Sequence, residues 1–123
     1  MNTPAVIAAL AALAQESRLA IFRLLVEAGP TGLAVGEIGA SLHVSPATLS
    51  FHLKELLHAD LIASRQDGRY IYYSANYQSM NDVIGYLTQN CCARDGIECA
   101  PGACGTKPSG AKRRVTRRVS KSR

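Results

Sequence analysis

The sequence predicts a mainly α-helical domain that carries one β-hairpin. Apolar residues recur at helical spacing in five separate stretches, and a two-residue link, Asp67-Gly68, joins two β-prone runs. The chain has 123 residues, of which 47% are hydrophobic, enough for one modest core. We therefore expect one folded domain over residues 1–90, a cysteine-rich segment over 91–106 and a basic tail over 107–123.

Three helices are expected before residue 43. They cover residues 4–13, 17–28 and 35–42, with Ser17 as a candidate N-cap and Gly29-Pro30 as the stop signal of the second helix. Two internal glycines make the third helix weak in isolation, so it must depend on packing. In the first helix, Val6, Ile7, Leu10 and Leu13 lie at helical spacing. The positions expected to face the core in the second and third helices are Leu19, Phe22, Leu25, Val26, Val35, Ile38 and Leu42.

The fourth helix, residues 46–58, has the clearest signals. Ser45 is a candidate N-cap, and Pro46 falls at the first helical position, where its missing N–H costs nothing. A stripe of four leucines marks the buried face. Two helices joined by the short connector His43-Val44, the second well capped and amphipathic, predict a helix-turn-helix. The leucines are Leu49, Leu53, Leu56 and Leu57.

A hairpin and one more helix complete the domain. The runs LIASRQ and RYIYYS flank Asp67-Gly68, a strong hairpin signal. A hairpin directly after a helix-turn-helix is a wing, so the predicted fold is a winged helix-turn-helix. The last helix is expected over residues 77–90, with Met80, Val83, Ile84 and Leu87 on one stripe.

The face of helix 46–58 opposite the leucines is the expected DNA-reading surface. Phe51 is an unusual outward residue: it would contact a thymine methyl group in the major groove, or else a protein partner or the wing. Lys54, Arg65 and Arg69 suit phosphates, although each could be an ordinary solvated charge. The three histidines are expected at the surface or at DNA rather than on a metal. The predicted DNA-contacting residues are Ser45, Ala47, Thr48, Ser50, Phe51, His52, Lys54, Arg65 and Arg69.

Charge is unevenly distributed along the chain. The tail, residues 107–123, holds eight Lys/Arg and no acidic residue, which leaves residues 1–106 with a net charge of −3. Such a tail cannot bury a core, so we expect a disordered arm that adds sequence-independent affinity for DNA, or a solvated tail without a role. The motifs, rather than the charge of the folded part, therefore carry the prediction of double-stranded DNA as a partner.

All four cysteines lie in one short stretch, with the spacing C-C-x6-C-x4-C. The chain shows neither a basic leader nor an apolar run of about 20 residues, so we expect a cytoplasmic protein that does not enter a membrane. Thiols stay reduced there, and neighbouring thiolates bind soft ions. The spacing does not match a zinc ribbon. We predict a soft-ion or metalloid site built from Cys91 and Cys92 with Cys99 or Cys104, the alternatives being a thiol redox switch or unused cysteines.

Residues 17–74 resemble the ArsR/SmtB metalloregulators, a family of homodimeric winged-helix repressors. The matching runs are SRLAIFRLL, SPATLSFHLKELLHADLI and RQDGRYIYYS, and the Asn-Cys-Cys at 90–92 resembles one arsenical-resistance subtype. The resemblance implies a homodimer that uses residues 4–13 and 77–90, and release from operator DNA when As(III) or Sb(III) binds Cys91, Cys92 and Cys99. It assigns no role to Cys104, which stays a candidate ligand, and we expect no organic cofactor.

Two departures and two alternatives accompany the resemblance. Residues 34–37 lack the C-x-C of the best-known arsenic sensors, and residues 77–90 lack the histidines of the zinc sensors. A repressor that senses thiol oxidation or Cd, Zn or Pb through the same cysteines is the alternative function. An enzyme such as an arsenate reductase is not expected, because no C-x5-R anion-binding loop surrounds any cysteine.

Overall fold

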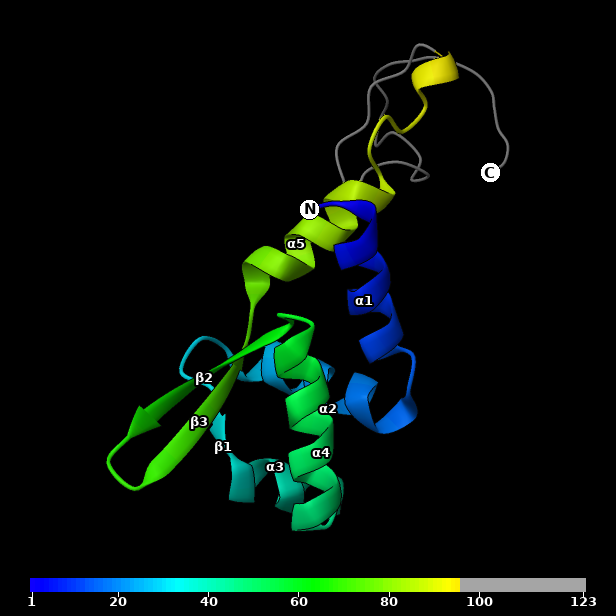
Figure 1. Cartoon of the computed structure of the whole chain (residues 1–123). Coiled ribbons are helices and arrows are strands. Elements are labelled where there is room, and N and C mark those ends of the chain that lie inside the picture. Colours follow the sequence, from blue (N-terminus) through cyan, green and yellow to red (C-terminus); the bar gives the residue numbers. More distant parts are fainter. Residues whose placement is uncertain (96–123) are drawn as a thin grey trace, which may run out of the picture. The chain divides into compact units, whose positions relative to one another are not determined.

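The computed structural model describes residues 1–95, which form five α-helices, three strands and one short 3-10 helix (Figure 1). The chain divides into two units, Met1–Tyr86 and a second that begins at Leu87. The predicted mainly α-helical fold with a hairpin wing is confirmed. The elements are α1 (Thr3–Leu13), α2 (Glu16–Ala28), β1 (Leu33–Ala34), α3 (Val35–Leu42), α4 (Pro46–His58), β2 (Ile62–Asp67), β3 (Tyr70–Ala75), α5 (Tyr77–Leu87) and η1 (Ala93–Asp95).

Helices α3 and α4 form the predicted helix-turn-helix. The turn between them begins at His43, whose left-handed backbone (φ 56°) ends α3. Ser45 then caps α4, since its Oγ accepts a hydrogen bond from Thr48 N at 3.4 Å, and Pro46 occupies the first helical position. Both bounds of α4 agree with the prediction because cap, proline and leucine stripe all specify the same helix.

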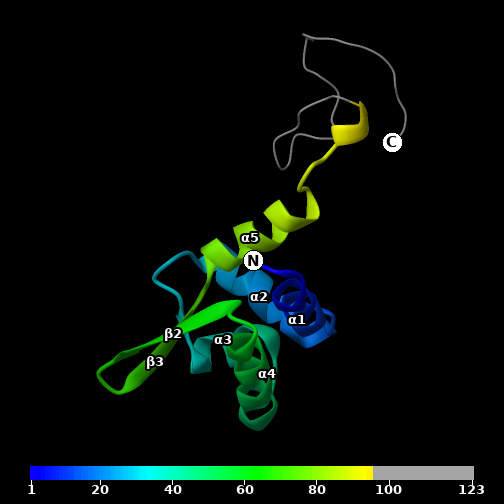
Figure 2. The same cartoon turned by 45° about the horizontal axis from the view of Figure 1, so that its top comes forward.

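The wing is the antiparallel pair β2–β3, which extends away from the helices in both views (Figures 1 and 2). Asp67 pairs with Tyr70, so the two-residue loop is Gly68-Arg69 rather than the predicted Asp67-Gly68. Gly68 has φ 65° and Arg69 has no positive φ, the pattern of a type II′ turn, which needs glycine at its first central position. The Asp-Gly pair predicted the hairpin correctly but placed its loop one residue early.

A third strand, β1, was not predicted. It pairs with β3, giving the strand order β1-β3-β2. Two residues are too few to show an alternating pattern. Gly32, immediately before it, has φ 76°, and a Cβ there would come within 2.9 Å of the Tyr73 carbonyl carbon. Glycine at position 32 therefore lets the chain approach β3 closely enough to add the strand.

The core lies among α2, α3, α4 and the base of the sheet. Its largest fully buried side chains are Ile21, Leu25, Ile38, Leu49, Leu53, Leu56 and Leu61. Leu19, which was predicted to lie in the core, is instead exposed, and Ile7 and Leu10 of the first helix are exposed as well. Helix α1 buries Val6, Ala9 and Ala12, because the alanine face lets α1 approach its neighbours closely. The apolar side chains of Ile7 and Leu10 on the opposite side of α1 are thus available for contact with another surface.

Two helix ends also differ from the predictions. Helix α2 begins after Gln15, whose Oε1 accepts a hydrogen bond from Arg18 N at 2.9 Å, so Gln15 and not Ser17 is the N-cap. Helix α5 ends at Leu87, three residues early. Within residues 1–95, no single helix is both long and apolar enough to cross a membrane, and only α1 and α2 together, bent by 101°, reach that length and composition.

Candidate nucleic-acid interface

Most of the residues predicted to contact DNA lie together on the exposed face of α4. The helix buries Leu49, Leu53 and Leu56 against the core, which turns the opposite side outward. That side presents a mixture of small, hydroxyl, aromatic and cationic groups, which suits contacts to both phosphates and base edges. The exposed predicted residues of this face are Ser45, Ala47, Thr48, Ser50, Phe51 and Lys54.

The start of α4 combines two hydroxyl groups with the free N–H groups of a helix N-terminus. Ser45 Oγ donates a hydrogen bond to Thr48 Oγ1 at 3.0 Å and accepts one from Thr48 N. Both side chains are exposed and fixed relative to each other. A helix N-terminus attracts phosphate through its dipole and unbonded N–H groups, so this end of α4 is suited to a DNA backbone contact.

Phe51 is 56% exposed, so the wing does not cover it. Its ring packs edge-on against the His52 ring, with centroids 5.7 Å apart. This contact limits the orientations that the Phe51 ring can adopt. An oriented apolar ring on an exposed recognition face is suited to contact with a thymine methyl group.

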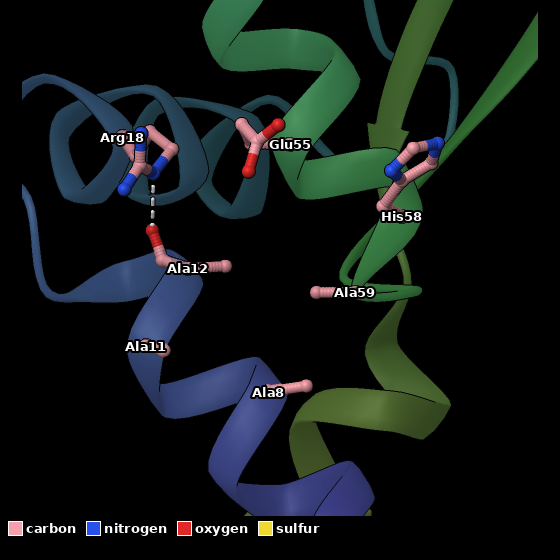
Figure 3. Close-up of a pocket in the computed structure, with 7 residues that line it drawn as sticks. All are labelled: Ala8, Ala11, Ala12, Arg18, Glu55, His58 and Ala59. Atoms are coloured by element: carbon pink, nitrogen blue, oxygen red, sulfur yellow. Dashed lines mark hydrogen bonds between the residues drawn. The ribbon is translucent and has the colours of Figure 1, made fainter.

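His52 is the one residue predicted on this face of α4 that is not exposed. It is only 8% exposed, and its Nδ1 lies 3.4 Å from Nη1 of Arg18 in α2. The same arginine donates from Nε to the Ala12 carbonyl at 2.7 Å, at the end of α1 (Figure 3). The spacing along α4 places residue 52 at the edge of the leucine stripe. It cannot show that Arg18 of α2 contacts this position. His52 therefore helps pack α4 onto α2, and little of its ring is exposed.

A pocket of about 290 Å³ lies among α1, α2 and α4 (Figure 3). Four alanines form its apolar wall, and Arg18, Glu55 and His58 supply its polar groups. No cysteine lines it, so it does not correspond to the predicted metalloid site. Glu55 and His58 thus face a hollow beside α1, while Lys54, the residue before Glu55, is exposed. The alanines are Ala8, Ala11, Ala12 and Ala59.

The two predicted wing arginines have different surroundings. Arg69 is exposed in the loop at the wing tip. Arg65 lies over the Tyr72 ring, 4.9 Å from its centroid, and both terminal nitrogens lie 3.3 Å from the Thr31 carbonyl oxygen. An arginine has five N–H donors, so Arg65 can anchor the wing to the loop before β1 and still reach a phosphate. No sequence pattern predicts this anchor, because Thr31 contributes only a backbone oxygen.

Cys91 and Cys92, in the second unit, place their sulfur atoms 3.5 Å apart, too far for a disulfide bond between them. Both are half-buried, and Cys92 has a left-handed backbone (φ 61°) in a turn where Ala93 N donates to the Asn90 carbonyl at 3.0 Å. Two thiolates bound tetrahedrally to one ion at about 2.3 Å lie about 3.8 Å apart. The pair is therefore already close to the spacing that a shared thiophilic ion requires.

The remaining predicted ligands, Cys99 and Cys104, lie outside the described residues, as does the basic tail. Among residues 1–95, no three His, Cys, Asp or Glu side chains come together in an arrangement that could hold a metal ion. The described part of the site is thus the vicinal pair alone.

A helix-turn-helix with an exposed second helix and a hairpin wing defines a winged helix-turn-helix DNA-binding protein. A family model described as a helix-turn-helix domain matches residues 13–65. An HTH-type transcriptional regulator of Bacillus subtilis, YceK, is 44% identical over 77 residues, 62% of this chain and 76% of the relative. The chain belongs to the ArsR-type family of helix-turn-helix transcriptional regulators.

Two further relatives agree with this assignment. The arsenical resistance operon repressor of Bacillus subtilis is 36% identical over 81 residues, 66% of this chain and 72% of that protein. The structure of an ArsR-like transcriptional regulator from Rhodococcus sp. RHA1 superposes with a TM-score of 0.67 at 26% identity, covering 76% of this chain and 85% of the other. These relatives are regulators of transcription, which confirms the prediction that the chain is not an enzyme.

Proposed function

We propose that this protein is a homodimeric repressor of an arsenic-resistance operon, released from its operator when As(III) or Sb(III) binds thiolates that include Cys91 and Cys92. The observation that carries the proposal is the vicinal sulfur pair, 3.5 Å apart, in a chain whose α4 exposes a DNA-reading face. The similarity to an arsenical resistance operon repressor supports the same inducer class. Trivalent arsenic and antimony are thiophilic, so neighbouring thiolates suit them.

Exposed apolar side chains on α1 and α5 support a homodimer. Helix α1 exposes Ile7 (60%) and Leu10 (40%), and α5 exposes Ile84 and Leu87. Helix α1 is apolar nearly all round, and such a helix is normally covered on every side. A second copy of the chain that packs α1 and α5 against its own would bury these residues. A twofold dimer would also present two copies of α4 to successive major grooves.

The third ligand comes from outside the described pair. Two sulfurs do not complete a thiolate site, and Cys99 is the candidate that the resemblance implies, with Cys104 as the other remaining cysteine. Thiolate ligands must lose their protons on binding, so the ion itself drives deprotonation. Release follows if the ion binds the DNA-incompetent arrangement of the dimer more tightly than the DNA-bound one.

The test is a titration of the protein bound to a fluorescent operator duplex, followed by anisotropy. Arsenite or antimonite at a stoichiometry near one per site is expected to release the DNA, whereas cadmium, zinc, lead and a mild oxidant such as diamide are not. Release by cadmium would identify a soft divalent metal sensor. Release by diamide without metalloid would identify a redox switch.

A further inference from the structure

Helix α5 is joined to the rest of the first unit by hydrogen bonds near both of its ends. The Tyr86 hydroxyl contacts Thr3 Oγ1 at the start of α1. The Tyr77 hydroxyl donates to the Val26 carbonyl of α2 at 3.2 Å. A third set of bonds, made by Asn76, reaches the turn that follows the DNA-reading helix α4. Asn76 thus connects the helix that precedes the cysteines with the helix that faces DNA.

Asn76 uses its backbone and both ends of its side-chain amide. Its backbone N donates to the Leu61 carbonyl at 2.8 Å, and its Nδ2 donates to the Asp60 carbonyl at 3.0 Å. Its Oδ1 accepts from Ser79 N at 3.2 Å, which caps α5. A backbone carbonyl only accepts and a backbone N–H only donates, so these neighbours fix the orientation of the amide.

The turn that Asn76 holds is itself bonded to α4. Asp60 has a left-handed backbone (φ 60°), and its N–H donates to the Leu57 carbonyl at 3.0 Å. Leu61 N donates to the Leu56 carbonyl at 3.1 Å, and the side chains of Leu56 and Leu61 are fully buried. A continuous series of hydrogen bonds therefore runs from the start of α5, through residues 60 and 61, into the last turn of α4.

The chemistry of an asparagine matters here because an N-cap needs only an acceptor. Aspartate and serine cap helices as well as asparagine does. Neither can reproduce the second bond from the same position: aspartate has no donor when ionised, and a serine hydroxyl is too short to replace the amide arm. The Nδ2 bond to Asp60 can therefore be removed while the cap of α5 is kept.

We propose that Asn76 is a positioning residue that transmits movement of α5 to the DNA-reading helix α4. The inference rests on the proposed function, in which the inducer binds at Cys91 and Cys92, beyond the end of α5. Coupling between two sites requires an element whose position both ligands bias. Only residues 88–90 separate the end of α5 from the cysteine pair along the chain, and Asn76 connects the start of α5 to the turn after α4. Loss of the hydrogen bond between Asn76 and Asp60 should therefore reduce the arsenite-induced change in operator affinity. It should change the unfolding temperature and the affinity for arsenite much less.

The experiment compares the full-length parent with Asn76→Asp and Asn76→Ser. For each protein, operator affinity is measured by anisotropy with and without arsenite, arsenite binding by titration, and thermal unfolding by circular dichroism. Asn2→Asp is the matched control, since Asn2 caps α1 by accepting from Ala5 N at 2.9 Å and the charge change is the same. We expect both Asn76 variants to bind arsenite and to unfold near the parent temperature. The arsenite-induced change in operator affinity should fall at least tenfold, and Asn2→Asp should respond like the parent.

Each other outcome contradicts a different claim. A parent-like response in the Asn76 variants would overturn the role of Asn76 while leaving the proposed inducer intact. Lost arsenite binding in these variants would also overturn it, because Asn76 would then support the site rather than transmit from it. A parent that arsenite does not release would overturn the proposed function and the transmission role together. If Asn76→Asp fails to fold, Asn76→Ser, which adds no charge, decides the question.

Discussion

Arg18 and His52 face each other across α2 and α4, with Nη1 3.4 Å from Nδ1. The contact holds one side chain of the recognition helix in the interior, and the same guanidinium also bonds the Ala12 carbonyl. Three helices therefore meet at one arginine. The contacts on this buried side of α4 hold the helix in position and so help to set the orientation of its DNA-reading face.

Replacement of Arg18 should destabilise the fold. Arg18→Met keeps most of the aliphatic length but leaves the Ala12 carbonyl and His52 without their donor. We expect the free energy of unfolding to fall by about 1–3 kcal/mol, the cost of an unsatisfied, partly buried polar group. Urea denaturation measures the change. Arg23→Met, at an exposed position of the same helix, is the control and should change stability little; an equal loss in both variants would contradict the role of the contact.

The ring of Phe51 should contribute to sequence discrimination. Phe51→Ala removes an exposed group, so we expect little loss of stability and a reduced ratio between operator and random-DNA affinity. Lys54→Ala is the comparison. It should weaken binding to both DNAs alike and lower the slope of log affinity against log salt by about 1. Competition anisotropy at several salt concentrations separates the two effects, and uniform weakening by Phe51→Ala would count against base contact.

Two glycines should respond in opposite directions to the same change. Gly32→Ala forces a Cβ against the Tyr73 carbonyl group at φ 76°, so β1 must separate from β3 and stability should drop by more than about 1 kcal/mol. Gly36→Ala, in α3, meets no atom within 4 Å and should stabilise the helix by up to about 1 kcal/mol. Thermal unfolding of the two variants tests this. A Gly32→Ala protein as stable as the parent would show that the fold does not depend on the close approach of residue 32 to β3.

The apolar surface of α1 should mediate self-association. Leu10→Glu places a charge in the proposed dimer interface, so sedimentation should show a shift from dimer to monomer and a weaker operator complex. Ile71→Glu, at a similarly exposed position on the wing, should leave the dimer intact. A Leu10→Glu protein that still sediments like the parent would place the interface elsewhere.

The sequence specified the fold where several local signals agreed. For α4, a cap, a proline and a leucine stripe all marked the same bounds, Pro46–His58. It said less where an apolar helix can pack either against the core of its own chain or against another surface. Ile7 and Leu10 fit a helical stripe, but the alanines of α1 pack closer to the core. Periodicity identifies an apolar face without showing whether its neighbour is the same chain or another surface.

The candidate site was predictable to a similar degree. Spacing along α4 identified the exposed row that includes Phe51 and Lys54, because helix geometry alone determines it. The burial of His52 depends on Arg18, 34 residues away in the chain. The bond between Asn76 and Asp60 likewise joins two turns that no local pattern relates. Contacts of this kind follow from tertiary packing and need the structure.

The most direct test of the proposed function is arsenite titration of the operator complex with the parent, Cys91→Ser and Cys92→Ser. Each serine variant should bind the operator with parent affinity in the absence of arsenite, since neither sulfur belongs to the exposed face of α4 or to the wing. We expect arsenite to release the parent and to leave both variants on the DNA across the range that empties the parent complex. Parent-like release of either variant would contradict the assignment of the vicinal cysteines as the inducer site.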